Sequence, residues 1–142
     1  HQFWTSFGKY MAPLLSAEGE KVNWVNYKTG IRNVYFRLEV TRNEAYIAIE
    51  ILHNEPGRGE KIFNQFVLLK NILEESTGES WQWEPKCMND QQQVLSRISR
   101  RLGAVSVYDE SHWPTIISFL KPGMIALDTF WCAYKIIFEM LD

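Results

Sequence analysis

Two glutamates, Glu39 and Glu50, are the residues of this chain with the clearest potential for catalysis. They lie in neighbouring stretches with strand-like sequences, and a pair of converging carboxylates can hold a divalent metal for hydrolysis. Such a site also needs a lysine to position the attacking water, but the residue two after Glu50 is Leu52. His53 would fall on the opposite face of the strand. We therefore expect the glutamates to pair with arginines, and we predict neither a metal site nor a catalytic residue.

Polar and aromatic side chains alternate with apolar ones along residues 31–40 and 44–53. In a β-strand this period of two places the polar residues on one face of the sheet and the apolar residues on the other. A sheet face that carries exposed tyrosines and charges of both signs is a candidate binding surface. Its predicted members are Tyr35, Arg37, Glu39, Tyr46 and Glu50.

The stretch 86–103 is the most basic part of the chain, with four Lys and Arg against one Asp, whereas the whole chain has a net charge of -2. Three of these cations, Arg97, Arg100 and Arg101, gather on one side if the stretch is helical. Beside exposed tryptophans, such a patch could bind single-stranded nucleic acid. The interpretation we favour is a solvated helix face, whose late cations complement the helix dipole.

Length and composition limit the possible functions. The chain has 142 residues, 46% hydrophobic and 23% charged, which fits one globular domain over 1–142. No overall positive field would attract nucleic acid, and no uninterrupted apolar run approaches the ~18 residues of a membrane span. Cys87 and Cys132 lie far apart without the spacing of metal ligands. We expect a soluble cytoplasmic protein without a cofactor and without a membrane partner.

The expected elements are deduced from hydrophobic periodicity and from turn residues. The segment 94–102 fits a helix started by an Asp90–Gln93 capping box, which we prefer to a strand. The full expectation is helices over 3–14, 60–77, 94–102, 111–121 and 124–141, and strands over 22–27, 31–40, 44–53, 80–86 and 105–108.

This order, helix, three strands, helix, strand, helix, short strand and two helices, predicts an α+β fold. Tight turns join the first three strands, so we expect a largely antiparallel sheet of four or five strands with helices packed on its apolar face. The first part of the order is also the core order of PD-(D/E)xK nucleases. A divergent nuclease-like domain is therefore an alternative, although the lysine of its motif is missing.

Several stretches resemble a bacterial domain-of-unknown-function family, number 4268. They are the opening FWTSFGKYM, the turn NWVNYKTG, the segments YIAIEI and SWQW, and SVYDESHWPTIISFLKPGMIALDTFW with its HWP helix start. These matches span nearly the whole chain. The resemblance implies a compact bacterial domain, sometimes attached to nuclease-like partners, in nucleic-acid metabolism or defence.

From the residues, we expect a non-catalytic intracellular binding or interaction module, and the sequence leaves its partner open between a protein and, less favoured, a nucleic acid. The alternative is the nuclease-like domain, or a nucleic-acid-binding domain, acting in DNA metabolism or defence. Metal binding at Glu39 and Glu50 would favour an enzyme. Salt-dependent affinity of Arg97, Arg100 and Arg101 for nucleic acid would favour direct binding.

Overall fold

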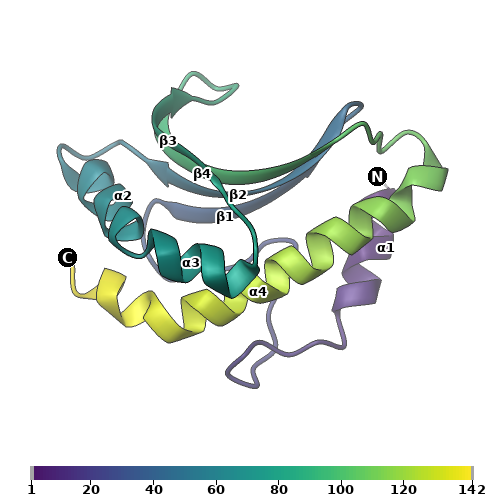
Figure 1. The fold of residues 1–142 in the computed structure, drawn as a ribbon, viewed down its shortest axis with the longest axis horizontal. Helices are drawn as coiled ribbons and strands as arrows, with labels where there is room; N and C mark the ends of the chain where they lie inside the picture. The colour runs from purple at the N-terminus through teal and green to yellow at the C-terminus, as the bar shows by residue number, and fades with distance from the viewer. Residues whose placement is uncertain (1, 142) are drawn as a thin grey trace.

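The computed structural model describes residues 2–141, which form a four-stranded antiparallel sheet with helices on one side (Figure 1). The strands are β1 (Val34–Val40), β2 (Glu44–Leu52), β3 (Gln82–Met88) and β4 (Val94–Gly103), in the spatial order β1-β2-β4-β3. The helices are α1 (Gln2–Met11), α2 (Arg58–Leu68), α3 (Lys70–Thr77) and α4 (Trp113–Glu139), with a 3-10 turn, η1 (Glu110–His112), before α4. The predicted α+β class is confirmed.

The β1–β2 hairpin forms as expected, because alternating apolar residues give each strand one buried face. Phe36 and Leu38 pair with Ile49 and Ile47 across the hairpin, and all four are buried. They face the layer made by α2, α3 and α4, which lies under the sheet in Figure 1. The opposite face of the sheet carries the polar residues, and no described helix covers it.

Residues 94–102, predicted as a helix, are the strand β4. Val94, Ile98 and Leu102 recur every fourth residue, a spacing that puts them on one face of a helix and also on one face of a strand. Pairing decides between the two, because β4 hydrogen-bonds to β2 on one side and to β3 on the other. Asp90 and Gln93, the residues of the expected capping box, instead lie in the β3–β4 turn. Asn89 closes this turn, because its Oδ1 accepts the backbone N–H of Gln93 at 2.9 Å.

The two short strands expected at 22–27 and 105–108 do not form. In the first, Asn23 Oδ1 accepts the backbone N–H groups of Val25 and Asn26 at 3.1 and 3.0 Å, a local turn that competes with a ladder. In the second, Val107 donates one backbone bond to the carbonyl of Thr41 and the chain then turns. The apolar residues of both segments still pack against the core.

Helix boundaries differ from the sequence prediction at two places. The helix expected over 60–77 breaks at Leu69 into α2 and α3. The two helices expected around Pro122 are one continuous helix, α4. A proline removes one helix hydrogen bond, but Gly123 beside it has no side chain and lets α4 approach Ile47 of β2 closely. Packing against the sheet thus favours continuity over the break.

The segment Glu110–Glu139 is long and apolar enough to cross a membrane, by length and composition only. Its location in the domain accounts for that composition, because α4 runs the length of the helical layer beneath the sheet and its side chains join the hydrophobic core (Figure 1). It also carries a buried acid, Asp128, which is 1% exposed. These features are typical of the core helix of a small soluble domain.

Asp128 fixes the chain between α1 and β1 to α4. Its carboxylate accepts the Tyr27 hydroxyl at 2.6 Å and the Ala17 backbone N–H at 2.8 Å, and the Cys132 thiol lies at 3.6 Å. Burial, reinforced by the Asp128 charge, raises the pKa of Tyr27 far above its usual value and that of Cys132 to about 11. Both side chains therefore stay neutral hydrogen-bond donors to this acid. We refer to Asp128, Tyr27, Ala17 and Cys132 as the Asp128 cluster.

Candidate functional site

The uncovered face of the sheet gathers charged and aromatic side chains from β1, β2 and β4. Strand register determines the arrangement, since Tyr35 lies opposite Glu50 and Glu50 lies opposite Arg97. Four residues from Glu50 along β2, Tyr46 lies opposite Arg101 of β4. We call this surface the polar sheet face, and define it as Tyr35, Arg37, Glu39, Glu44, Tyr46, Glu50, Arg97 and Arg101.

Glu50 is the centre of the polar sheet face. One carboxylate oxygen accepts Nε of Arg97 at 2.9 Å, and the other accepts Nε of Arg37 at 3.3 Å. Only 10% of the Glu50 side chain is exposed, so two cations neutralise an acid that would be costly to bury alone. Burial alone would lower the pKa of Arg97, but the hydrogen bond and charge of Glu50 raise it. Arg97 is therefore fixed as a cation.

Two tyrosines are stacked with arginines on the same face. The Arg37 guanidinium carbon lies 4.6 Å from the centre of the Tyr35 ring, and that of Arg101 lies 4.5 Å from the centre of the Tyr46 ring. Arg101 also pairs with Glu44 at 3.0 Å. Cation–π contact and ion pairing orient each planar guanidinium, so the surface is preorganised before any ligand binds.

A hollow of about 690 Å³ opens over these side chains. The sheet forms its floor, and the turn between β3 and β4, residues 88–93, forms one wall. In Figure 1 this turn rises on the side of the sheet opposite the helices. Burial raises the pKa of Glu39 in this hollow, with the negative charges of Glu50 and Asp90 adding to the effect and Arg37 opposing it.

All five residues predicted for the sheet surface lie on the polar sheet face, and two of the three predicted basic residues, Arg97 and Arg101, join them. Arg100 does not, because alternation along β4 turns it toward the helices. There its Nη2 lies 3.8 Å from Glu79, and its guanidinium lies 5.3 Å from the centre of the Phe119 ring. Burial lowers the pKa of Arg100. The predicted basic patch is therefore wrong as a unit, since a strand divides it between two faces.

The register does not bring Glu39 and Glu50 together as metal ligands. Glu39 lies opposite Tyr46, which is four residues from Glu50 along β2, or ~14 Å at strand spacing. Both Glu50 oxygens are already taken by arginines. Across residues 2–141, no group of three or more His, Cys, Asp or Glu side chains could hold a metal ion.

A second polar arrangement was missed from the sequence, and it has the connectivity of a hydrolase triad. Ser96 Oγ lies 2.7 Å from His53 Nε2, and His53 Nδ1 lies 3.1 Å from Glu60. Ser96 is fully buried on the helix side of β4, and its hydroxyl donates to the Pro85 carbonyl at 2.7 Å. A catalytic nucleophile must be accessible to its substrate, and the buried Ser96 is not. These hydrogen bonds therefore serve to join β2, α2 and β4.

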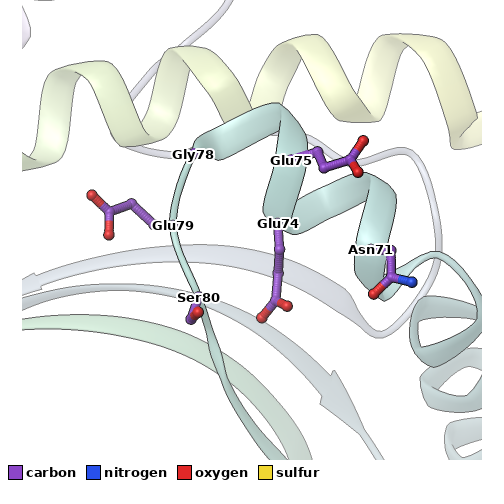
Figure 2. Close-up of a pocket in the computed structure, with 6 residues that line it drawn as sticks. All are labelled: Asn71, Glu74, Glu75, Gly78, Glu79 and Ser80. Carbon is purple, nitrogen blue, oxygen red and sulfur yellow. The ribbon is translucent and has the colours of Figure 1, made fainter.

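Three acids lie around the end of α3, where a depression of about 540 Å³ is lined by the residues of Figure 2. The carboxylates of Glu74, Glu75 and Glu79 point in different directions in that view. Glu74 accepts the backbone N–H of Trp81 at 2.9 Å, and this bond lowers its pKa. Glu74 therefore fastens α3 to the start of β3, and the three acids do not converge on a ligand.

Thr41, Glu44 and the 88–93 turn are the parts of the hollow that the sequence prediction omitted. Extending the alternation of Tyr46 and Glu50 backward by two residues places Glu44 on the same face, so that signal was present. The turn could not be found, because its position depended on recognising 94–102 as a strand.

A family model described as Domain of unknown function (DUF4268) matches residues 1–135, which is nearly the whole chain. The chain belongs to this family. The resemblance read from its motifs is thus confirmed. No curated protein and no solved structure matches the chain, so within this family the geometry of the polar sheet face is the available guide to function.

Proposed function

We propose that this family member is a non-catalytic cytoplasmic binding module that holds a protein partner on its polar sheet face. The observation that carries the proposal is the ordered set of Arg–Glu pairs and Arg–Tyr stacks on the one sheet face that the helices leave uncovered. Tyrosine and arginine are the residues most often found at energetic centres of protein interfaces. Their fixed rotamers reduce the entropy lost on binding.

Charge balance favours a protein over a nucleic acid as the partner. The hollow is lined by three arginines against three glutamates and one aspartate, which gives a net charge of −1. All three arginines are already paired with glutamates of the same face. Phosphate binding releases counterions only when cations are available to neutralise it. A partner with side chains of both signs fits this surface better.

The test is capture of interacting proteins on the immobilised domain, followed by binding measurements with the purified partner. We expect the double variant Tyr46→Ala with Arg101→Gln to bind that partner ~30-fold more weakly or worse, as is usual when hot-spot residues are removed. The matched control is Leu68→Ala, because Leu68 is 78% exposed on α2 in the helix layer. Equal loss with the control, or full retention with the face variant, would contradict the proposal.

Single-stranded nucleic acid is the second candidate, favoured by the two Tyr–Arg stacks on an open sheet, which could receive bases. An oligonucleotide titration at two salt concentrations separates the candidates. We expect no specific binding at physiological salt. Tight, salt-dependent binding would favour a nucleic acid as the partner over a protein if the double variant Arg97→Gln with Arg101→Gln abolishes it.

A nuclease-like role is tested separately, with DNA and RNA in Mg²⁺ or Mn²⁺. We expect no cleavage, because Glu50 is held by two arginines and the position of the motif lysine is Leu52. Cleavage that disappears in Glu50→Gln would assign catalysis to this face.

A further inference from the structure

The sheet has two edges, and they differ in how readily a further strand could pair with them. At one edge, β3 carries Pro85 and a shift of register between Glu84 and Cys87. A proline and a bulge are the features that discourage further strand pairing. At the other edge, β1 runs from Val34 to Val40 with an unbroken register to β2. Only the β1 edge is regular enough to continue the ladder.

The hydrogen-bond pattern shows which groups of β1 point away from the sheet. Leu52 N–H donates to the Asn33 carbonyl at 2.9 Å, which makes the odd-numbered residues of β1 the ones that bond to β2. The backbone N–H and C=O groups of Phe36, Leu38 and Val40 therefore point outward. Among residues 2–141, no backbone or side-chain hydrogen bond reaches these outward groups.

The open stretch has defined ends. At its start the Thr29 hydroxyl donates to the Val34 carbonyl at 2.8 Å, and just beyond its end the Val107 N–H donates to the Thr41 carbonyl at 3.0 Å. The segment 22–27, which would be the neighbouring strand, runs past without pairing because it turns on Asn23. A groove of about 400 Å³ remains, with residues 35–39 on one side and Trp4 and residues 25–28 on the other.

The groove suits a single strand of a partner better than the sheet of a second copy. A strand needs ~4.8 Å beside its neighbour, and a second copy would have to bring its own β2 a further strand width outward. Trp4 and residues 25–28 stand on that side of the groove. A lone extended segment would have β1 on one flank and these residues on the other.

Charge gives the chemistry of that segment. In an added antiparallel strand, residues opposite Arg37 and Glu39 form the non-hydrogen-bonded pairs, whose side chains lie closest. An acid opposite Arg37 and a base opposite Glu39 would be complementary, and the residue between them would point toward the apolar side of the groove. Within the described chain Glu39 has no ion-pair partner at salt-bridge distance.

We propose that the open edge of β1 accepts an extended segment of a partner protein as a fifth, antiparallel strand, and that the segment carries a basic, an apolar and an acidic residue in succession. The inference rests on the proposed function only in taking the partner to be a protein. Its site is the β1 edge and its groove, adjacent to the hollow of the polar sheet face.

The probe is a blocked synthetic peptide with the sequence of residues 33–41, NVYFRLEVT, which carries Arg-Leu-Glu. Pairing antiparallel about Leu38 puts its Arg and Glu opposite Glu39 and Arg37. We expect saturable binding to the whole domain, followed by amide chemical shifts in β1. N-methylation of the peptide's Leu removes one ladder donor and should weaken binding ~10-fold. Equal binding of the methylated peptide, or no binding of NVYFRLEVT, overturns the proposal.

Charge reversal tests the register. Among residues 2–141 the Glu39 carboxylate forms no hydrogen bond and no ion pair, so Glu39→Lys should leave the fold intact, which circular dichroism checks. We expect the variant to bind NVYFRLEVT ~10-fold more weakly than the unaltered protein does. We expect it to bind the peptide NVYFELEVT, for which the unaltered protein should have low affinity. Unchanged preference in the variant contradicts the proposed register.

Two further measurements separate this inference from its alternatives. Tyr46→Ala should leave peptide binding unchanged, because Tyr46, although it lies opposite Glu39 across the hairpin, does not line the β1 groove. The peptide could bind although no protein partner depends on the polar sheet face. That result would support the β1 edge as a binding site and would contradict only the proposed function. A dimer of the free protein that Glu39→Lys dissociates would assign the edge to a second copy and overturn the proposal of a partner segment.

Discussion

Two buried acids of this protein accept hydrogen bonds from different kinds of donor. Glu50, 7% exposed on the polar sheet face, receives two arginines from neighbouring strands. Asp128, 1% exposed in the Asp128 cluster, receives a tyrosine hydroxyl and a backbone N–H, which are neutral donors. The donors to Glu50 come from adjacent positions of one sheet, whereas those to Asp128 lie 101 and 111 residues away in sequence.

The difference separates a surface that can exchange partners from a junction that cannot. The Arg37–Glu50 pair remains accessible to a ligand and to water, because half of the Arg37 side chain is exposed. The neutral donors to Asp128 come from the segment between α1 and β1, so losing them removes two of the hydrogen bonds that hold this segment to α4, and the bond from Trp131 Nε1–H to the Thr29 carbonyl at 2.8 Å remains. We therefore expect mutations in the Asp128 cluster to act on stability, and mutations in the polar sheet face to act mainly on binding.

The largest effect should come from Asp128→Ala. It removes a buried acceptor and leaves its three donors, the Ala17 N–H, the Tyr27 hydroxyl and the Cys132 thiol, without this partner, which should lower the free energy of unfolding by ~3 kcal/mol. Urea unfolding at neutral pH measures the change. A loss below ~0.5 kcal/mol would show that the hydrogen bonds of Asp128 contribute little to holding the segment 12–31 on α4.

Tyr27→Phe should sharpen the comparison by removing one donor and keeping the ring. The Tyr27 ring stacks on Phe36 at 5.2 Å between centres, so packing stays while the 2.6 Å bond to Asp128 is lost. We expect a loss of ~2 kcal/mol, the usual value for a hydrogen bond to a charged group. Thermal and urea unfolding measure it, and Tyr134→Phe is the matched control, since the Tyr134 hydroxyl forms no hydrogen bond within residues 2–141.

Glu50→Gln should cost less, ~1 kcal/mol, because Arg37 is partly exposed and solvent can compensate for the lost charge. The effect should also decline as salt is raised, since salt screens the pairs at a partly exposed surface. The measurement is urea unfolding at low and high salt beside Tyr27→Phe, whose effect should not change with salt. A salt-independent loss above that of Tyr27→Phe would contradict the comparison.

The smallest effect should be that of Glu39→Gln, and it should depend on pH. Burial raises the Glu39 pKa in the folded state above the value of 4.5, so ionisation favours the unfolded chain as pH rises through that window. The variant should be more stable than the unaltered protein at pH 7, by less than ~0.5 kcal/mol, and equally stable below pH 4.5, where both states are protonated. Unfolding measured at both pH values checks the sign, and a less stable variant at pH 7 would contradict it.

Part of the polar sheet face could be predicted because β-strand geometry is local. Alternation placed Tyr35, Arg37 and Glu39 on one face and Tyr46 and Glu50 on the same face of the next strand, and the tight turn between them fixed the pairing. The sequence also predicted the α+β class and the family. Its prediction of a binding function remains a proposal.

Other features depended on contacts that no local pattern encodes. The segment 94–102 has apolar spacing compatible with helix and strand, and two flanking strands decide for strand, which brings Arg97 and Arg101 to Glu50 and Tyr46 and sends Arg100 to the other face. The Asp128 cluster was not predicted, because a carboxylate on an apolar helix gives no sign of which distant donors will reach it.

The sequence by itself therefore determined the elements whose period is unambiguous, namely the β1–β2 hairpin, the apolar core face and the first members of the polar sheet face. Tertiary structure alone decided the identity of β4, the continuity of α4 through Pro122, and the open edge of β1. The physical reason is the range of the interactions. Side-chain alternation and tight turns act over a few residues, whereas strand pairing, close helix–sheet packing at Gly123 and burial of Asp128 require segments that meet only after the chain has folded.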